Sequence, residues 1–260
     1  SPALVAGTVR AISLSQDDEA RSVARHAARS GYRRAMVLFP DTAWGSRMAD
    51  VFSEEFLQDG RQILEEIRYP SSQNDHSMLL QTALKIDESK ARRTQLENTL
   101  GRSVEFEPVR RDDIDVIFMA ADPVQARQIR PQLKFHDAGS IPVYATGRVF
   151  SGEPDPIRNR DLDGVRVPSM RWQIENPDTD GIPSYASLRQ GARSRLFALG
   201  MDAWNLLPWL DLMRHDPDFR FQGQSGTWHD EGNGQFVREP GWAVFRNGRP
   251  VPLDTDAVQR

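Results

Sequence analysis

The chain has 260 residues, 38% of them hydrophobic and 27% charged, with a formal net charge of −4, so it can form one or two compact domains with an apolar core. The absence of cysteine excludes disulfides, thiolate nucleophiles and cysteine-based metal sites. The mildly acidic balance argues against a general nucleic-acid binder, and no apolar run approaches the roughly 20 residues that span a bilayer.

The N-terminal part of the chain predicts alternating helices and strands. Residues 17–30 predict a helix, since Ser15 is suited to the N-cap and acidic residues occupy the first turn. Residues 34–39 form a continuous apolar run that is typical of a buried parallel strand. Residues 42–58 return to a helical period, and residues 62–69 alternate like a second strand. This order and spacing indicate a βαβ arrangement.

The middle of the chain continues this alternation. Residues 77–100 predict a heavily charged, mostly helical segment, and its portion KIDESKARRTQLENTLG is expected to be a solvated helix or a mobile insertion. A helix should begin at Pro123, because proline is favoured in the first helical turn. Further short apolar runs predict strands at residues 114–120, 141–145 and 162–167.

The last third of the chain has a different texture. Residues 184–215 predict helix with a break near Pro208. From residue 219 onward, alternation and glycine-rich turns predict antiparallel strands, with a hairpin turn around residues 230–234.

The sequence carries no local catalytic or metal-binding motif. The five histidines are widely separated, so none has metal-ligand spacing with another. There is no Gly-x-Ser-x-Gly elbow, no Ser-x-x-Lys motif and no phosphate-binding loop. The acidic pairs fall on predicted solvent faces or in turns, which favours ordinary surface charge over a glycosidase pair. We therefore expect no catalytic residue, no metal and no cofactor.

Three loops following predicted parallel strands are candidates for a recognition site. Ligands of open α/β sheets bind at the carboxyl ends of the strands. Aromatic, hydroxyl and charged side chains in such loops are typical of a cleft for a small molecule or peptide. The alternative interpretation is structural, with the two aspartates as helix N-caps or next to such caps and the tryptophan in the core. The loops offer Asp41, Trp44, Asp122, Tyr144, Thr146 and Arg148.

Four stretches resemble the LppC family of lipoproteins, which has a type 1 periplasmic binding protein fold. In that fold two βαβ lobes close on a ligand. The resemblance runs from about Ile12 to Leu253, and its most specific parts are RRDDIDVIFMAADPVQARQIRPQLKF, PVYATGRVFSG, RDLDGV and FRNGRPVPL.

The resemblance implies a domain organisation. Residues 12–183 should form lobe two, a three-layer α/β lobe around a parallel sheet. Residues 184–215 should be helices that normally pack on lobe one, and residues 216–260 a returning antiparallel β segment with a C-terminal tail. Because most of lobe one is expected to be absent, the helix around residues 199–212 should expose an apolar face.

The family also implies a function. Its members are anchored by an N-terminal lipid, absent from this chain, on the periplasmic side of the outer membrane. They stimulate a class A penicillin-binding protein, a bifunctional peptidoglycan synthase, without doing chemistry themselves. We expect this role for the chain, with a membrane contact only through that anchor and no contact with nucleic acid.

A second hypothesis stays open from the sequence. The interlobe cleft could bind an amino acid or a peptidoglycan fragment, which requires convergent polar groups around an open pocket. A regulator could instead fill its cleft with large side chains such as Arg148, Phe150, Arg171 and Trp172. Arginine and aromatic residues are also frequent at protein interfaces.

Overall fold

A computed structural model describes residues 12–103, 108–174, 188–191, 193–230 and 236–253, in which helices and strands alternate. The strands are β1 (Arg34–Pro40), β2 (Gln62–Tyr69), β3 (Val116–Met119), β4 (Val143–Ala145), β5 (Val165–Ser169), β6 (Phe221–Gln222), β7 (Thr227–Asp230), β8 (Phe236–Glu239), β9 (Gly241–Arg246) and β10 (Arg249–Pro252). The α-helices are α1 (Gln16–Arg29), α2 (Ala43–Phe56), α3 (Ser77–Ala83), α4 (Ile86–Leu100), α5 (Pro123–Phe135), α6 (Arg171–Ile174), α7 (Arg193–Leu206) and α8 (Leu210–His215).

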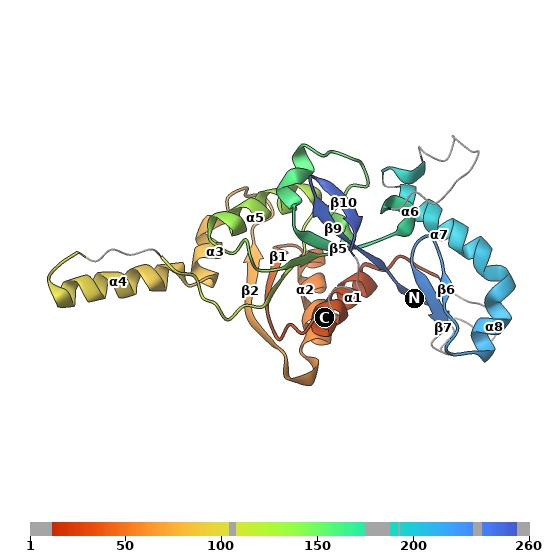
Figure 1. Ribbon diagram of the computed structural model, residues 1–260, viewed down its shortest axis with the longest axis horizontal. Helices are drawn as coiled ribbons and strands as arrows, with labels where there is room; N and C mark the ends of the chain where they lie inside the picture. The colour runs from red at the N-terminus through yellow and green to blue at the C-terminus, as the bar shows by residue number, and fades with distance from the viewer. Residues whose placement is uncertain (1–11, 104–107, 175–187, 192, 231–235, 254–260) are drawn as a thin grey trace.

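The main body is a three-layer α/β lobe (Figure 1). Its seven-stranded sheet has the order β10-β9-β5-β4-β3-β1-β2, with β1 to β5 parallel and β9 antiparallel to both of its neighbours. One apolar cluster joins one face of the sheet to α1 and α2, and a second joins the other face to α3 and α5. The α/β periplasmic-binding-protein-like lobe predicted from the sequence is confirmed.

Local sequence explains why α1 begins and packs where it does. The hydroxyl of Ser15 accepts a hydrogen bond from the amide of Asp18 at 3.3 Å, which confirms Ser15 as the N-cap. Ala20, Val23 and Ala27 follow at helical spacing and are fully buried against the sheet. The period of the apolar residues therefore sets both the helix and its buried face.

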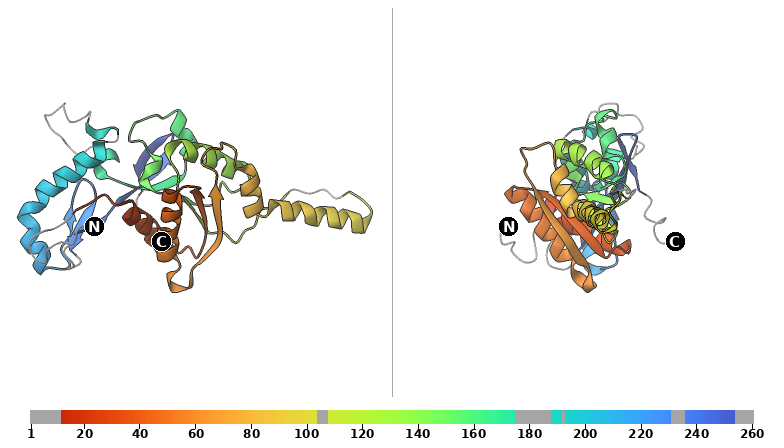
Figure 2. Two further views of the ribbon diagram at one scale, coloured as in Figure 1. Left: turned by 180° about the vertical axis from the view of Figure 1, so that it is seen from behind. Right: turned by 90° about the vertical axis from the view of Figure 1, so that its left-hand side faces the viewer.

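The charged segment expected at residues 77–100 is two helices rather than one. Lys85, between α3 and α4, has a left-handed backbone (φ 56°), which interrupts the helical hydrogen bonding. Figures 1 and 2 show α4 extending from the lobe as an arm. Ile86 and Ser89, at its root, are its only buried residues. The arm is consistent with the interpretation as a solvated helix.

The C-terminal segment is divided between two sheets. β9 and β10 complete the main sheet, while β6, β7 and β8 form a separate three-stranded antiparallel sheet packed against α7 and α8. The antiparallel strands expected in this segment are present, and they belong to two sheets because the strand that starts at Gly241 pairs with β5. The break near Pro208 is confirmed as a short 3-10 helix at Leu207–Trp209. Residues 231–234 of the predicted hairpin turn lie outside the described residues.

One carboxylate holds α7 to the small sheet. Asp202 is fully buried and accepts hydrogen bonds from the amides of Gln224 (2.6 Å) and Ser225 (2.8 Å) and from the indole of Trp228 (2.9 Å). A Cβ at Gly223 would come within 2.4 Å of this carboxylate, so only glycine fits there. The opposite face of α7 is exposed and apolar, with Trp204 74% exposed.

No helix in the described ranges is long and apolar enough to cross a bilayer.

Candidate functional site

The carboxyl ends of β1, β3 and β4 place the three candidate loops along one edge of the sheet. These strands are neighbours in the sheet and run parallel, so their loops emerge on the same side. The loop after β1 leads into α2, the loop after β3 into α5, and the loop after β4 into a short 3-10 helix at Gly147–Val149.

Two of the predicted residues meet directly at this edge. The guanidinium carbon of Arg148 lies 4.5 Å from the ring centroid of Trp44, a cation–π geometry. The indole nitrogen of Trp44 donates to the side chain of Gln16 at 2.5 Å. Trp44 is half-buried and Arg148 is exposed, so the pair forms a fixed aromatic and cationic surface.

The two predicted aspartates have structural partners. Asp41 accepts a hydrogen bond from the amide of Ser71 at 2.8 Å, and the hydrogen bonds from Ser71 lower the pKa of this carboxyl. Asp122 is the N-cap of α5 and accepts from the amides of Val124 (2.8 Å) and Gln125 (2.9 Å). The side chain of Gln125 completes the capping box. The geometry therefore supports the N-cap interpretation for Asp122, whereas Thr42 caps α2 and Asp41, beside that cap, holds the loop after β2.

The residues of and after β4 divide between core and surface. Tyr144 is fully buried on the α1 face of the sheet, where its hydroxyl accepts from Arg166 at 2.7 Å, so it does not face the edge. Thr146 is fully buried as well, and its hydroxyl has no hydrogen-bond partner among the described residues. Phe150 packs on the core and contacts Phe245 edge-to-face at 5.8 Å.

A buried carboxylate beside Gly147 was not predicted. Glu19 of α1 is 2% exposed and accepts a hydrogen bond from the amide of Gly147 at 3.1 Å. It pairs with Arg195 of α7, and with Arg238 of β8 at 3.4 Å. We call Glu19, Arg195 and Arg238 the ion cluster. Burial lowers the pKa of Arg238, and the nearby carboxylate of Glu19 opposes this shift.

The ion cluster joins the lobe to the C-terminal part of the chain. It connects α1 and the loop after β4 with α7 and the small sheet. A Cβ at Gly147 would lie 3.0 Å from Arg195 and 3.2 Å from the Glu19 carboxylate, so a larger residue would have to displace the ion cluster by a few tenths of an ångström. A sequence signal existed for Glu19, which precedes Val23 by one helical turn on the buried face of α1.

The part of this edge beside the ion cluster leaves little room for a ligand. The space between the ion cluster, Gly147 and Phe150 encloses about 10 Å³. Small-molecule sites usually offer roughly 300 to 1,000 Å³. Among the described residues no group of three or more histidine, aspartate or glutamate side chains could hold a metal ion. The arrangement presents a packed surface with Trp44 and Arg148 on it.

The lobe topology and its loop edge define a domain of the periplasmic-binding-protein class. Full-length LpoA from Haemophilus influenzae superposes with a TM-score of 0.66 at 20% identity, covering 92% of this chain and 39% of that one. The C-domain of the same protein, described as a regulator of PBP1A, gives 0.66 at 19% identity over 93% and 68%. A substrate-binding protein of an ABC transporter from Desulfitobacterium hafniense, in complex with Leu, gives 0.52 at 18% identity over 92% and 65%.

The chain belongs to the LppC family. The model of this family, described as LppC putative lipoprotein, matches residues 5–248. Two relatives are named penicillin-binding protein activator LpoA. The one from Klebsiella pneumoniae is 24% identical, covering 92% of this chain and 35% of its own length. The one from Photobacterium profundum is 26% identical, covering 92% and 40%. The chain therefore spans well under half of these relatives.

Proposed function

We propose that this chain is part of a non-enzymatic regulator that stimulates a class A penicillin-binding protein by direct contact. The observation that carries the proposal is the family match over residues 5–248, together with the name of its relatives, penicillin-binding protein activator. An activator of this kind acts as a ligand does, by binding the active conformation of the synthase better than the inactive one.

The packed loop edge supports protein contact over small-molecule binding. A space of about 10 Å³ beside the ion cluster is close to the volume of one water, well below that of an amino acid. Trp44 and Arg148 are surface residues of the types that dominate protein interfaces. We propose this pair, with Phe150 behind it, as part of the contact surface. Asp41, Asp122, Tyr144 and Thr146 then have structural roles in the lobe rather than a part in the contact.

The family description as a lipoprotein also supports a location. We propose that the full-length protein is held by an N-terminal lipid at the outer membrane and acts in the periplasm, where peptidoglycan synthases work. Binding of peptidoglycan fragments or an amino acid in the interlobe cleft has less support, because the relatives are named as activators and the space beside the ion cluster holds only about 10 Å³.

The test is a binding assay between the full-length protein and its cognate class A penicillin-binding protein. Trp44→Ala and Arg148→Ala should each weaken binding about tenfold, the effect expected for an interface hot spot. Arg92→Ala provides a matched control, because Arg92 is an exposed arginine on the α4 arm. The transpeptidase rate of the synthase should fall with the same variants. Absence of binding by the unmodified protein would remove the proposal.

A further inference from the structure

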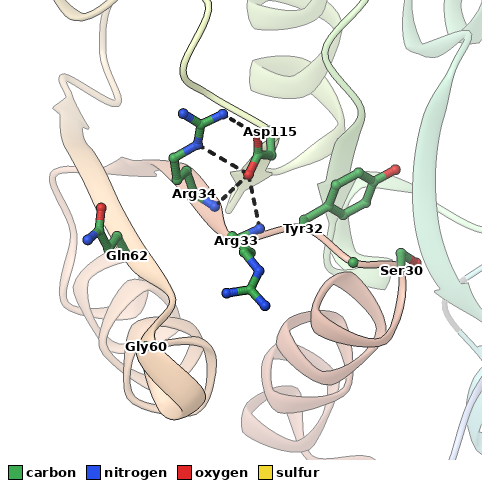
Figure 3. A pocket seen from close by; sticks show the side chains of 8 residues that line it. Ser30, Tyr32, Arg33, Arg34, Gly60, Gln62 and Asp115 are labelled. Atoms are coloured by element: carbon green, nitrogen blue, oxygen red, sulfur yellow. Dashed lines mark hydrogen bonds and ion pairs between the residues drawn. The ribbon is translucent and has the colours of Figure 1, made fainter.

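A second hollow lies at the opposite edge of the main sheet, far from the loops described above. It has a volume of about 590 Å³ and is lined by the α1–β1 connection (residues 30–34), Gly60, Gln62 and Asp115 (Figure 3). These residues stand at the amino ends of β1 and β2 and just before β3. The volume falls within the range of ligand-binding sites, roughly 300 to 1,000 Å³.

One of the two arginines in this hollow is committed to the fold. Arg34 pairs with the carboxylate of Asp115 through Nη2 at 2.9 Å and Nε at 3.4 Å. The same carboxylate accepts from the amides of Arg33 (3.0 Å) and Arg34 (2.9 Å). The charge of Arg34 is thereby neutralised, and the start of β1 is fixed to the residue before β3.

The second arginine is not neutralised. The side chain of Arg33 is exposed, and its guanidinium forms no ion pair or hydrogen bond with any described residue. Its backbone is held at both ends, because its amide donates to Asp115 and its carbonyl accepts from the amide of Gln62 at 2.8 Å. Figure 3 shows the guanidinium directed between Gly60 and the end of α1, away from Asp115. Within the described part of the chain, Arg33 therefore presents a cation without a counter-ion from a backbone that is fixed at both ends.

The walls of the hollow are open and suited to a peptide. Gly31 and Gly60 have left-handed backbones (φ 85° and 72°), and a Cβ at either position would meet nothing within 4 Å. Gln62 offers an exposed amide. Tyr32 borders the hollow, but its half-buried ring points away from Gln62 and Arg33 (Figure 3), and its hydroxyl is held by Arg166 at 3.2 Å. The site thus combines one cation, one amide and an open backbone wall at the two glycines.

We propose that this hollow binds a carboxylate carried by a peptide. The planar guanidinium of Arg33 matches a carboxylate in two parallel hydrogen bonds, and Gln62 can bond the adjoining peptide group. A single uncompensated positive charge suits a monoanion better than a dianion such as phosphate, because the Arg34–Asp115 pair has no net charge to offer. This site is independent of the contact surface proposed above, and it lies at the other edge of the sheet.

The test is calorimetry of the full-length protein at low ionic strength with the peptide acetyl-Ala-Glu-Ala-amide. The peptide acetyl-Ala-Gln-Ala-amide has the same shape without the charge and should bind at least about tenfold more weakly. Arg33→Gln should cause a similar loss, while Arg92→Gln on the α4 arm should cause none. High salt should lower the affinity for the charged peptide, since the site is open to solvent. Thermal unfolding of Arg33→Gln should match that of the unmodified protein.

Three results would overturn this site. They are equal binding of the two peptides, unchanged binding in Arg33→Gln, and tighter binding of inorganic phosphate than of the glutamate peptide. Acetate serves as a further arm, because a bare carboxylate that binds as well as the peptide would remove the role of Gln62. Trp44→Ala should leave peptide binding unchanged, because Trp44 lies outside this hollow. The synthase-binding proposal and the peptide-site proposal can therefore fail independently of each other.

Discussion

At the scale of single residues, the ion cluster is the most consequential arrangement in the chain. Glu19 is 2% exposed and Arg238 is 8% exposed, so neither charge is well hydrated. A buried charge is tolerated only when an opposite charge and hydrogen bonds compensate for lost solvation. Glu19 supplies that compensation for two arginines from different elements and for the amide of Gly147.

Replacing Glu19 tests this role. Glu19→Gln keeps the shape of the side chain but leaves Arg238 buried without its counter-ion. We expect the free energy of unfolding to fall by about 3 kcal/mol, as for other broken buried ion pairs. Asp18→Asn, which removes an exposed pair with Arg21, should cost less than about 1 kcal/mol. Urea unfolding measures both, and equal losses would show that the burial of Glu19 is unimportant.

His26 gives the stability a pH dependence. Burial, with a smaller contribution from Arg166, lowers the pKa of His26 from 6.5 to about 4. The unfolded chain therefore binds a proton more readily than the folded chain between these values, and stability is lost as the pH falls through that window. His76 and His136 have pKa values lowered mainly by burial and act in the same direction.

The variant His26→Phe isolates this contribution. The His26 ring stacks on Trp242 at 3.9 Å, and phenylalanine can keep the stacking without taking a charge. Between pH 7 and pH 5 we expect the unmodified protein to lose about 1 to 2 kcal/mol more than the variant, after allowance for partial solvent exposure. Denaturant unfolding at both pH values measures this difference. If the free energy of unfolding changed with pH by the same amount in both proteins, His26 would not be the source of the pH dependence.

At the scale of elements, the helix caps and buried strands were predictable, and the side-chain partners were not. Ser15 and the run of β1 carry local signals, which act within a few residues. Tyr144 was expected at the edge of the sheet because β4 ends beside it. Its side chain instead lies in the buried cluster between the sheet and α1. The ion cluster joins residues 19, 195 and 238, and no local pattern records such distant contacts.

Variants of Asp122 can separate its role as the cap of α5 from a role in partner binding. Asp122→Ala removes both cap hydrogen bonds of α5 and should lower the free energy of unfolding by about 1 kcal/mol, and at most about 2. Asp122→Asn keeps a capping oxygen and should lose only a few tenths. Thermal unfolding measures stability, and the synthase-binding assay should give wild-type affinity for both. Weakened binding in a fully folded Asp122→Asn variant would return Asp122 to the contact surface.

At the scale of the whole molecule, the notable surface is a stripe of exposed apolar side chains along α7 and the residue after it, which we call the stripe. Leu196, Trp204 and Leu207 lie at helical spacing and are 65%, 74% and 55% exposed. Trp209 in the following 3-10 helix and Leu212 in α8 are 43% and 42% exposed. So many large apolar side chains exposed on consecutive helical elements favour association. We propose that this surface packs on lobe one in the full-length protein, whose relatives are much longer than this chain.

The proposal predicts how the 260-residue chain should behave by itself. Its apolar stripe should cause concentration-dependent self-association, because burying two or three large side chains per copy is favourable. The double variant Trp204→Ser with Leu207→Ser should be monomeric at the same concentration in analytical ultracentrifugation. Ile157→Ser is the matched control, because Ile157 is 88% exposed but far from the stripe in sequence and belongs to the lobe. In the full-length protein the same double variant should lower the unfolding temperature, since the stripe would then be buried. A monomeric unmodified chain, or a full-length protein indifferent to the double variant, would contradict this account of the stripe.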